Sequence, residues 1–234
     1  MTYNRRCQET LPMKVWKKIW ITLLCWQDRR RDKKICGTSL VSFPKAHSNQ
    51  VHASQPSHYR VLEKIFCKSH FTEDDSILDI GCGKGRILAF FTERGHKGKL
   101  TGVELRKEVA EECRQWIKAY PNIQIIAGNV LELDLNNYTV MVMFNPFGAN
   151  VLLSLLEKME KELTHPIHLY YLSDHEYGNH INGRPGWELK HRGWVWKDGP
   201  YYLYWTPQRC SWWCYTPKNT TAATGSCIPE GSKK

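Results

Sequence analysis

Three closely spaced glycines and an acidic residue have the types and spacing needed to bind a nucleotide-like cofactor. An apolar run over residues 77–80 leads into the glycine loop, residues 81–85, which has glycine at its first, third and fifth positions. Because glycine has no Cβ, such a loop turns tightly and lets a ligand lie against bare backbone. A second apolar run, residues 100–103, ends in Glu104, whose carboxylate can accept hydrogen bonds from both hydroxyls of a ribose. Together these two features predict a cofactor site and hence an enzyme.

The spacing of the glycines distinguishes between two classes of cofactor. A dinucleotide-binding loop follows the pattern GxGxxG/A, which requires a small residue at position 86. This chain has Arg86 there, and its third glycine, Gly85, comes one position earlier. The pattern therefore disfavours an NAD-dependent oxidoreductase, which stays as a less favoured alternative.

The glycine loop and the acid two positions before it resemble the first motif, (D/E)xGxGxG, of class I S-adenosylmethionine-dependent methyltransferases. The resemblance implies an α/β, Rossmann-like fold with a mostly parallel seven-stranded sheet and a C-terminal antiparallel hairpin. It also implies S-adenosyl-L-methionine as the cofactor, with the loop around its methionine part and Glu104 on its ribose. The candidate cofactor-binding residues are Asp79, Gly81, Cys82, Gly83, Gly85, Glu104, Asn129 and Val130.

Asn129 and Val130 enter this set because they follow the third expected strand, residues 122–126. Related methyltransferases often have Asp at the position of Asn129, where the side chain accepts from the adenine amino group. An amide oxygen can accept the same hydrogen bond, and Val130 offers a backbone or apolar contact. A simple turn at residues 128–129 is the alternative interpretation.

The fourth expected strand, residues 139–144, runs into Asn145, Pro146, Phe147 and Gly148. This run resembles the (D/N)PP(Y/F) motif of methyltransferases that modify amide or aromatic amine nitrogens. The resemblance implies that Asn145 orients the nucleophile and that Pro146 and Phe147 contact the substrate. Gly148 stands where the motif has its aromatic ring, which argues against a DNA base or a glutamine as the target. A plain strand-to-helix turn is the alternative.

Alternating strands and helices must position these residues, and such alternation predicts a parallel sheet with helices on both faces. The expected strands are 76–80, 99–104, 122–126, 139–144 and 167–172, and the expected helices are 85–94, 106–119 and 149–163. Aromatic runs near 187–196 and 201–205 flank Asp198-Gly199, a pair typical of a hairpin turn. Upstream of the sheet, residues 55–59 resemble a segment of some uncharacterised bacterial methyltransferases, which makes Tyr59 a candidate substrate contact.

The positive charge of the chain is concentrated in its N-terminal arm. The 234-residue chain has a formal net charge of +10, of which residues 1–50 contribute +8 (eleven Lys and Arg minus three Asp and Glu). Residues 11–27 predict a basic amphipathic helix whose apolar stretch is shorter than the ~20 residues that span a bilayer. Three alternatives follow: the helix packs on the catalytic domain, residues 11–34 lie on an anionic membrane, or the helix binds nucleic acid.

We therefore expect a basic arm and linker at 1–50, a methyltransferase domain at 51–206 and a mobile tail at 207–234. Nine cysteines without a CxxC pair predict unpaired thiols in a reducing cytoplasm, with no disulfide partner and no metal site. The expected activity is methyl transfer (EC 2.1.1.-) to an unidentified protein, nucleic-acid or small-molecule acceptor, with nitrogen as a candidate atom. The non-enzymatic alternative is a cofactor-binding module associated with membrane or RNA.

Overall fold

The computed structural model describes residues 11–41, 57–175, 177–196 and 208–218. Within these residues, the helices are α1 (Leu11–Cys36), α2 (Tyr59–Ile65), α3 (Arg86–Glu93), α4 (Lys107–Ile117) and α5 (Ala149–Glu162). The strands are β1 (Ile77–Ile80), β2 (Leu100–Glu104), β3 (Ile123–Ala127), β4 (Val140–Phe144), β5 (Ile167–Leu172), β6 (Trp187–Trp196) and β7 (Gln208–Tyr215). Three short 3₁₀ helices are also described: η1 (Val130–Glu132), η2 (Leu135–Asn137) and η3 (Gly178–Ile181).

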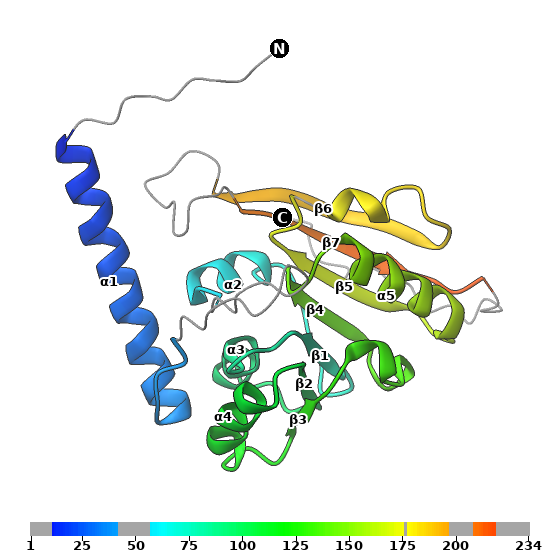
Figure 1. Cartoon of the computed structure of the whole chain (residues 1–234), viewed down its shortest axis with the longest axis horizontal. Coiled ribbons are helices and arrows are strands. Elements are labelled where there is room, and N and C mark those ends of the chain that lie inside the picture. The colour runs from blue at the N-terminus through cyan, green and yellow to red at the C-terminus, as the bar shows by residue number, and fades with distance from the viewer. Residues whose placement is uncertain (1–10, 42–56, 176, 197–207, 219–234) are drawn as a thin grey trace, which may run out of the picture.

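The strands form one seven-stranded sheet in the order β3-β2-β1-β4-β5-β7-β6 (Figure 1). β1 to β5 run parallel, and β7 pairs antiparallel with both β5 and β6. The strand order reverses at β1, which lies between β2 and β4, and ligands of open α/β sheets bind beyond the carboxyl ends of the strands at such a point. The fold predicted from the sequence is confirmed, and it places the glycine loop at this switch point.

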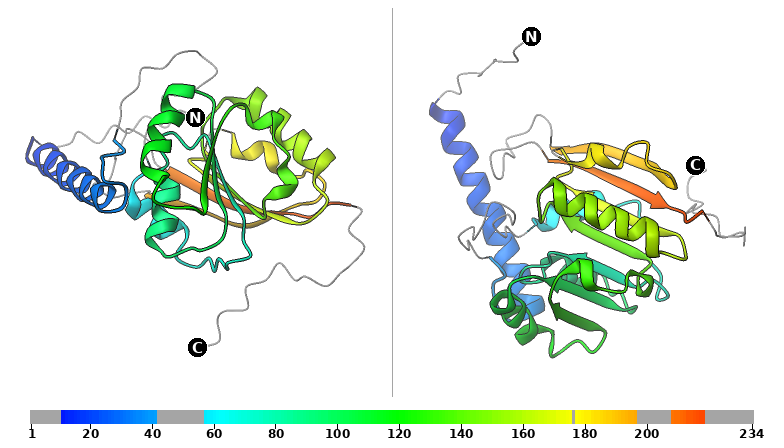
Figure 2. Two further views of the ribbon diagram at one scale, coloured as in Figure 1. Left: turned by 90° about the horizontal axis from the view of Figure 1, so that it is seen from below. Right: turned by 45° about the vertical axis from the view of Figure 1, so that its right-hand side comes forward.

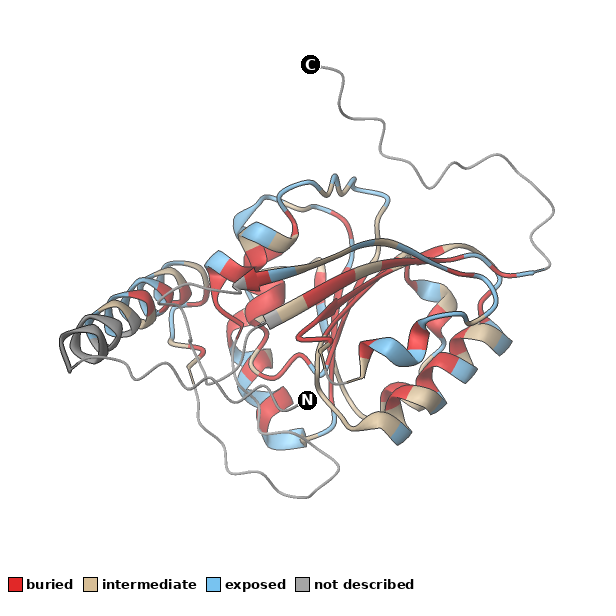
Figure 3. Ribbon diagram, turned by 90° about the horizontal axis from the view of Figure 1, so that it is seen from above, coloured by how far each residue is buried: buried red, intermediate tan, exposed pale blue. Residues whose placement is uncertain are grey.

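Helices cover both faces of the sheet, as a parallel sheet requires (Figure 2). One core contains the aromatic side chains of Phe66, Phe90 and Phe91 and lies under α2, α3 and α4. The other core lies under α5, which contributes the buried residues Leu152, Leu155, Leu156 and Met159. Figure 3 shows buried residues along the strands and on the inner sides of these helices.

The C-terminal hairpin is present, but its second strand differs from the prediction. The strand that pairs with β6 is β7, whereas residues 201–205 and the Asp198-Gly199 pair lie outside the described residues. The predicted mobile tail from residue 207 is therefore wrong for residues 208–215. These residues belong to the sheet because their aromatic side chains pack on it: the ring of Trp212 stacks on Tyr170 at 5.6 Å, and Trp213 is buried.

The N-terminal helix α1 is longer than the predicted 11–27, because it extends to Cys36, and it packs against the domain, as the first of the three alternatives expected. Leu24, Cys36 and Leu40 are buried, and α1 contacts α3. The N-terminal part of α1 extends beyond the sheet domain in both Figure 1 and Figure 2. A domain boundary at residue 50 therefore separates segments that pack together. None of the described helices is long and apolar enough to cross a membrane.

Candidate cofactor and acceptor site

The glycine loop has a backbone that other residues adopt only with strain. The φ angles are +73° at Gly81, +55° at Gly83 and +85° at Gly85, all in the left-handed region. A Cβ on Gly81 would lie 2.5 Å from the Cβ of Pro146, and one on Gly85 would lie 2.6 Å from the Sγ of Cys113. The glycines are therefore required both for the turn and for the close approach of neighbouring segments.

Side chains from β2 and α4 hold the glycine loop. The buried carboxylate of Glu104 accepts a hydrogen bond from the Gly83 amide at 3.0 Å and from the Arg106 amide at 3.1 Å. On the other side, Trp116 Nε1 donates to the Lys84 carbonyl oxygen at 3.0 Å. Glu104 thus lies where the sequence predicted it, directly beside the loop.

Two further candidate residues in this region are buried, and the pKa of each is raised. Asp79 is 1% exposed, and its Oδ2 accepts no hydrogen bond from any described residue. Burial, followed by the nearby negative charge of Glu104, raises the pKa of Asp79 well above its usual range. A hydrogen bond with Cys113, followed by burial, raises the pKa of Cys82, which keeps this thiol protonated at neutral pH.

Asn129 and Val130 lie at the end of β3, next to the end of β2. The Asn129 side-chain oxygen accepts a hydrogen bond from the Leu131 amide at 3.1 Å and so caps η1. Val130 is buried. The capping bond corresponds to the turn interpretation, but an amide oxygen has a second lone pair with which it can accept from a ligand. An adenine contact by Asn129 stays a prediction.

The end of β4 brings the candidate acceptor residues against the glycine loop. Pro146 makes the close approach to Gly81, and the Asn145 side-chain oxygen accepts a hydrogen bond from the Tyr171 hydroxyl at 3.1 Å. The φ angle of Asn145 is +40°, and that of Ser173 at the end of neighbouring β5 is +58°. No other non-glycine residue in the described part of the chain has a positive φ, and such strain concentrates at functional sites.

The register of the sheet brings these two strained residues together. Phe144 pairs with Leu172, so Asn145 and Ser173 directly follow a matched pair of residues on adjacent parallel strands. Sequence reasoning missed Tyr171 and Ser173, because no local motif marks them and only the pairing of β4 with β5 places them beside Asn145. Phe147 is partly buried against the core under α5.

Tyr59 does not lie where the sequence resemblance implied. Its side chain is 0% exposed, and its ring lies 4.2 Å from the guanidinium of Arg31 and 5.5 Å from that of Arg86. A ring enclosed between two arginines has no surface to offer a substrate. The expected substrate contact by Tyr59 is therefore wrong, and the residue instead joins α1 to the start of α3.

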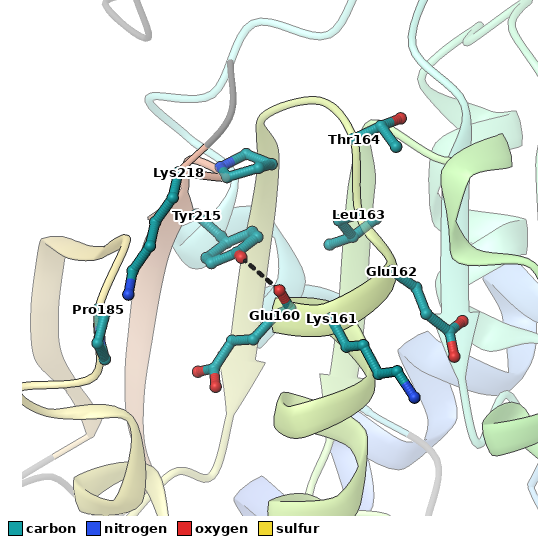
Figure 4. A pocket seen from close by; sticks show the side chains of 9 residues that line it. Glu160, Lys161, Glu162, Leu163, Thr164, Pro185, Tyr215 and Lys218 are labelled. Atoms are coloured by element: carbon teal, nitrogen blue, oxygen red, sulfur yellow. Dashed lines mark hydrogen bonds between the residues drawn. The ribbon is translucent and has the colours of Figure 1, made fainter.

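A cavity of about 590 Å³ lies at the opposite edge of the sheet, where α5 and β7 end (Figure 4). Its prominent polar group is already paired: the Glu160 carboxylate accepts hydrogen bonds from Arg184 and Trp187, and its carbonyl oxygen accepts from the Tyr215 hydroxyl. The cavity is thus separate from the glycine loop and does not contribute to the candidate site. No cluster of three or more possible metal ligands occurs among the residues the structure describes.

Comparison with known proteins identifies a family whose match includes the glycine loop at the switch point. The family described as "Methyltransferase domain" matches residues 77–164. A protein-lysine N-methyltransferase of Saccharolobus islandicus is 31% identical over 111 residues, which make up 46% of this chain and 68% of that protein. The chain belongs to the class I S-adenosylmethionine-dependent methyltransferases. S-adenosylmethionine is accordingly the cofactor of this methyltransferase.

Other relatives of this methyltransferase share shorter segments or the fold alone. An rRNA adenine N-6-methyltransferase of Lysinibacillus sphaericus is 26% identical over 98 residues, which cover 42% of this chain and 39% of that protein. An RNA methyltransferase of Salinibacter ruber in complex with S-adenosyl-L-homocysteine superposes with a TM-score of 0.52 at 18% identity, covering 76% of this chain and 99% of the other. A methyltransferase of Pyrococcus furiosus gives a TM-score of 0.55 at 17% identity, with 84% and 97% covered.

The residues present at the glycine loop fit this cofactor. S-adenosylmethionine carries an ammonium group and ribose hydroxyls, which donate hydrogen bonds, and a positive sulfonium, which favours nearby negatively charged oxygens. Asp79 supplies a buried oxygen that no described group satisfies, and Glu104 supplies a carboxylate at the end of the next strand. The loop between them has no side chain at Gly81 and Gly85, where a Cβ would collide with Pro146 and Cys113.

Proposed function

We propose that this protein transfers the methyl group of S-adenosylmethionine to the side-chain nitrogen of a lysine in a protein. The observation that carries the proposal is the contact between Pro146 and Gly81, which places Asn145, the strained residue at the end of β4, at the rim of the glycine loop. The similarity to a protein-lysine N-methyltransferase supports this acceptor.

The cofactor would be held by residues at the ends of three neighbouring strands. Glu104 would accept hydrogen bonds from the ribose hydroxyls, Asp79 would accept from the ammonium group, and Asn129 and Val130 would contact the adenine. The backbone of Gly81, Cys82, Gly83 and Gly85 would line the methionine part. When bound, S-adenosylmethionine supplies a methyl group on a sulfonium, so its leaving group is a neutral thioether.

Asn145 would orient the acceptor nitrogen. Its side-chain oxygen already accepts from the Tyr171 hydroxyl, which fixes the direction of the amide. The lysine ammonium must first lose a proton to solvent, because only the neutral amine has a lone pair. A second lone pair on the Asn145 oxygen can then accept from an N–H of that amine and so direct the nitrogen lone pair toward the methyl group. Alignment of this kind contributes about 7–11 kcal/mol to bimolecular reactions when the reacting atoms are held ~3–3.5 Å apart. Pro146 and Phe147 would form the adjoining wall of the acceptor site.

Gly148 supports an aliphatic amine over a nucleic-acid base as the acceptor. In the motif that the Asn145 segment resembles, an aromatic ring at this position packs on a planar target, and Gly148 has no side chain to do so. Methylation of an rRNA adenine is the second candidate, supported by the rRNA methyltransferase relatives. The two candidates give chemically different products.

A methyl-transfer assay separates these candidates. Cell extract is divided into protein, RNA, lipid and metabolite fractions, and each is incubated with the enzyme and S-[methyl-³H]adenosylmethionine. We expect label in the protein fraction and ε-N-methyl-lysine in its digest, both lost with Asn145→Ala. N6-methyladenine in the RNA fraction would instead establish the second candidate. Cofactor binding without transfer to any fraction would favour the non-catalytic module.

We also propose that the outward face of α1 rests on an anionic membrane surface. Ile19, Leu23 and Trp26 are 45%, 48% and 56% exposed and are spaced i, i+4 and i+7, which places them on one side of the helix. Exposed basic residues continue along the same region: Arg29, Arg30, Lys33 and Lys34. The acids Asp28 and Asp32 are buried on the opposite side, so the face that solvent meets combines apolar and positive groups.

Sedimentation with vesicles tests this second proposal. The protein should pellet with phosphatidylserine-containing vesicles but not with phosphatidylcholine vesicles, and Leu23→Ser/Trp26→Ser should reduce the pelleted fraction. Each basic residue near anionic lipid contributes about 1 kcal/mol, so Lys33→Gln/Lys34→Gln should weaken binding too. Absence of the wild-type protein from the anionic pellet would contradict a membrane role for α1.

A further inference from the structure

The residue that ends the glycine loop is a buried arginine. Arg86 begins α3 directly after Gly85, which has the left-handed backbone described above. The Arg86 side chain is 3% exposed, so its guanidinium does not face solvent. A buried charge requires close partners, because removing it from water costs several kcal/mol unless ion pairs and hydrogen bonds compensate. The partners of Arg86 therefore restrict where the loop ends.

These partners come mainly from α1, more than fifty residues earlier in the chain. Asp32, which is fully buried, binds Arg86 through both carboxylate oxygens, with Nε–Oδ1 at 3.1 Å and Nη2–Oδ2 at 2.6 Å. Asp28 Oδ2 lies 3.4 Å from Nη1, which also donates to the Ser57 carbonyl oxygen at 3.3 Å. A two-pronged arginine–carboxylate pair fixes distance and orientation together.

A second link between α1 and the domain avoids the glycine loop. The guanidinium of Arg31 pairs with Glu63 of α2 at 2.6 Å and with Glu93 at the end of α3. These side chains are partly exposed, between 26% and 42%. Both links fasten α1 to the domain, but of the two only the Asp28–Asp32–Arg86 link adjoins the glycine loop. An experiment can use this difference.

The glycine loop is also held by α4, through Trp116 and through the close approach of Gly85 to Cys113. We propose that Asp28 and Asp32 are positioning residues of the cofactor site, and that α1 and α4 together clamp the glycine loop in its cofactor-binding conformation. A helix that precedes the family match at residues 77–164 would then be required for cofactor binding. The proposal rests on the assignment of the cofactor to this loop.

Calorimetric titration with S-adenosyl-L-homocysteine tests this role in the full chain. Asp32→Asn keeps the side-chain volume but removes the charge and one acceptor for Arg86. Glu63→Gln is the matched control, because it weakens the link that avoids the loop. We expect Asp32→Asn to lower the affinity about tenfold or more, and Glu63→Gln to leave it within about twofold. Amide hydrogen exchange at Gly83 and Gly85 should rise in Asp32→Asn but not in Glu63→Gln.

Other outcomes would overturn the proposal in distinguishable ways. Unchanged affinity in Asp32→Asn, or an equal loss in both variants, would assign α1 a purely structural role. If the wild-type protein does not bind S-adenosyl-L-homocysteine, the cofactor assignment itself fails. Should Asp32→Asn not fold, Asp28→Asn gives a second comparison, because it weakens the longer contact with Arg86 together with the pairing of Asp28 Oδ2 and the buried His58 Nδ1 at 2.5 Å. An affinity for that variant equal to that of wild type would then reject the proposal.

Discussion

The carboxylate of Glu104 accepts a hydrogen bond from the backbone amide of Gly83 at 3.0 Å. The acid at the end of β2 and the glycine loop after β1 are therefore one hydrogen-bonded unit before any ligand is considered. Replacing Glu104 would affect the shape of the loop as well as any bond to the ribose, and two different substitutions separate these effects.

Glu104→Ala removes both the hydrogen bond to the Gly83 amide and any bond to the ribose. It should weaken binding of S-adenosyl-L-homocysteine at least tenfold, about 1.4 kcal/mol. Glu104→Gln keeps one oxygen that can accept from Gly83 but replaces the other with a donor, so it should retain the loop and still lose affinity. Calorimetry measures the dissociation constants of both variants, and amide hydrogen exchange at Gly83 reports whether the loop keeps its conformation. Full affinity in Glu104→Gln would reject the ribose contact.

Gly81→Ala should abolish cofactor binding because its Cβ would collide with Pro146 and its φ is +73°. Gly95→Ala is a matched control, since Gly95 has φ +78° but a Cβ at this residue would have no neighbouring atom within 4 Å. Both substitutions should cost about 1–2 kcal/mol of folding stability from the left-handed backbone. Loss of binding in both, or in neither, would show that the contact with Pro146 does not shape the site.

Asp79→Asn should stabilise the cofactor-free protein while weakening cofactor binding. Burial raises the pKa of Asp79 in the folded state above its unfolded value, so the native state binds more protons between those two pKa values. Stability therefore falls as the pH rises through this window, and the penalty is complete above the folded pKa. Urea unfolding should show the variant to be more stable than wild type at pH 8 and equal to it below the unfolded pKa. A less stable variant at pH 8 would mean that the ionised carboxylate has a favourable partner.

A chain that ends at residue 206 should not fold, because it lacks β7. This strand lies between β5 and β6, so its loss would leave β6 without its neighbour and uncover the ring of Tyr170. A chain that ends at residue 218 keeps every strand that the structure describes and should unfold cooperatively like the full protein. Circular dichroism during heating checks both, and a cooperative transition in the shorter chain would show that β7 is dispensable.

The parts of the site that the sequence predicted are those encoded by adjacent residues. The glycine loop, Glu104 and the Asn145 segment each lie at the carboxyl end of an apolar strand. A parallel sheet therefore brings them to one edge, independently of the sequence elsewhere in the chain. Strand alternation likewise predicted β1 to β5. Local spacing and one rule of topology were sufficient for these features.

Features that depend on pairing between distant residues were not predicted. Arg86 and Asp32 are 54 positions apart, and nothing near Asp32 marks it as a buried partner of the glycine loop. The aromatic runs at 201–205 and 208–215 are equally strand-like in sequence, so the sequence did not single out 208–215 as the strand that pairs with β5. Tyr59 was expected near the substrate from the resemblance of residues 55–59 alone. Its burial beside Arg31 and Arg86 depends on α1, which that segment does not reveal.

The binding of the cofactor in the glycine loop is tested most directly by titration of wild type and Gly81→Ala with S-adenosyl-L-homocysteine. We predict saturable binding of one molecule per chain to the wild type, and none to Gly81→Ala despite its retained fold. Absence of binding to the wild type, equal binding to the variant, or binding of NADH in its place would contradict a cofactor site in the glycine loop.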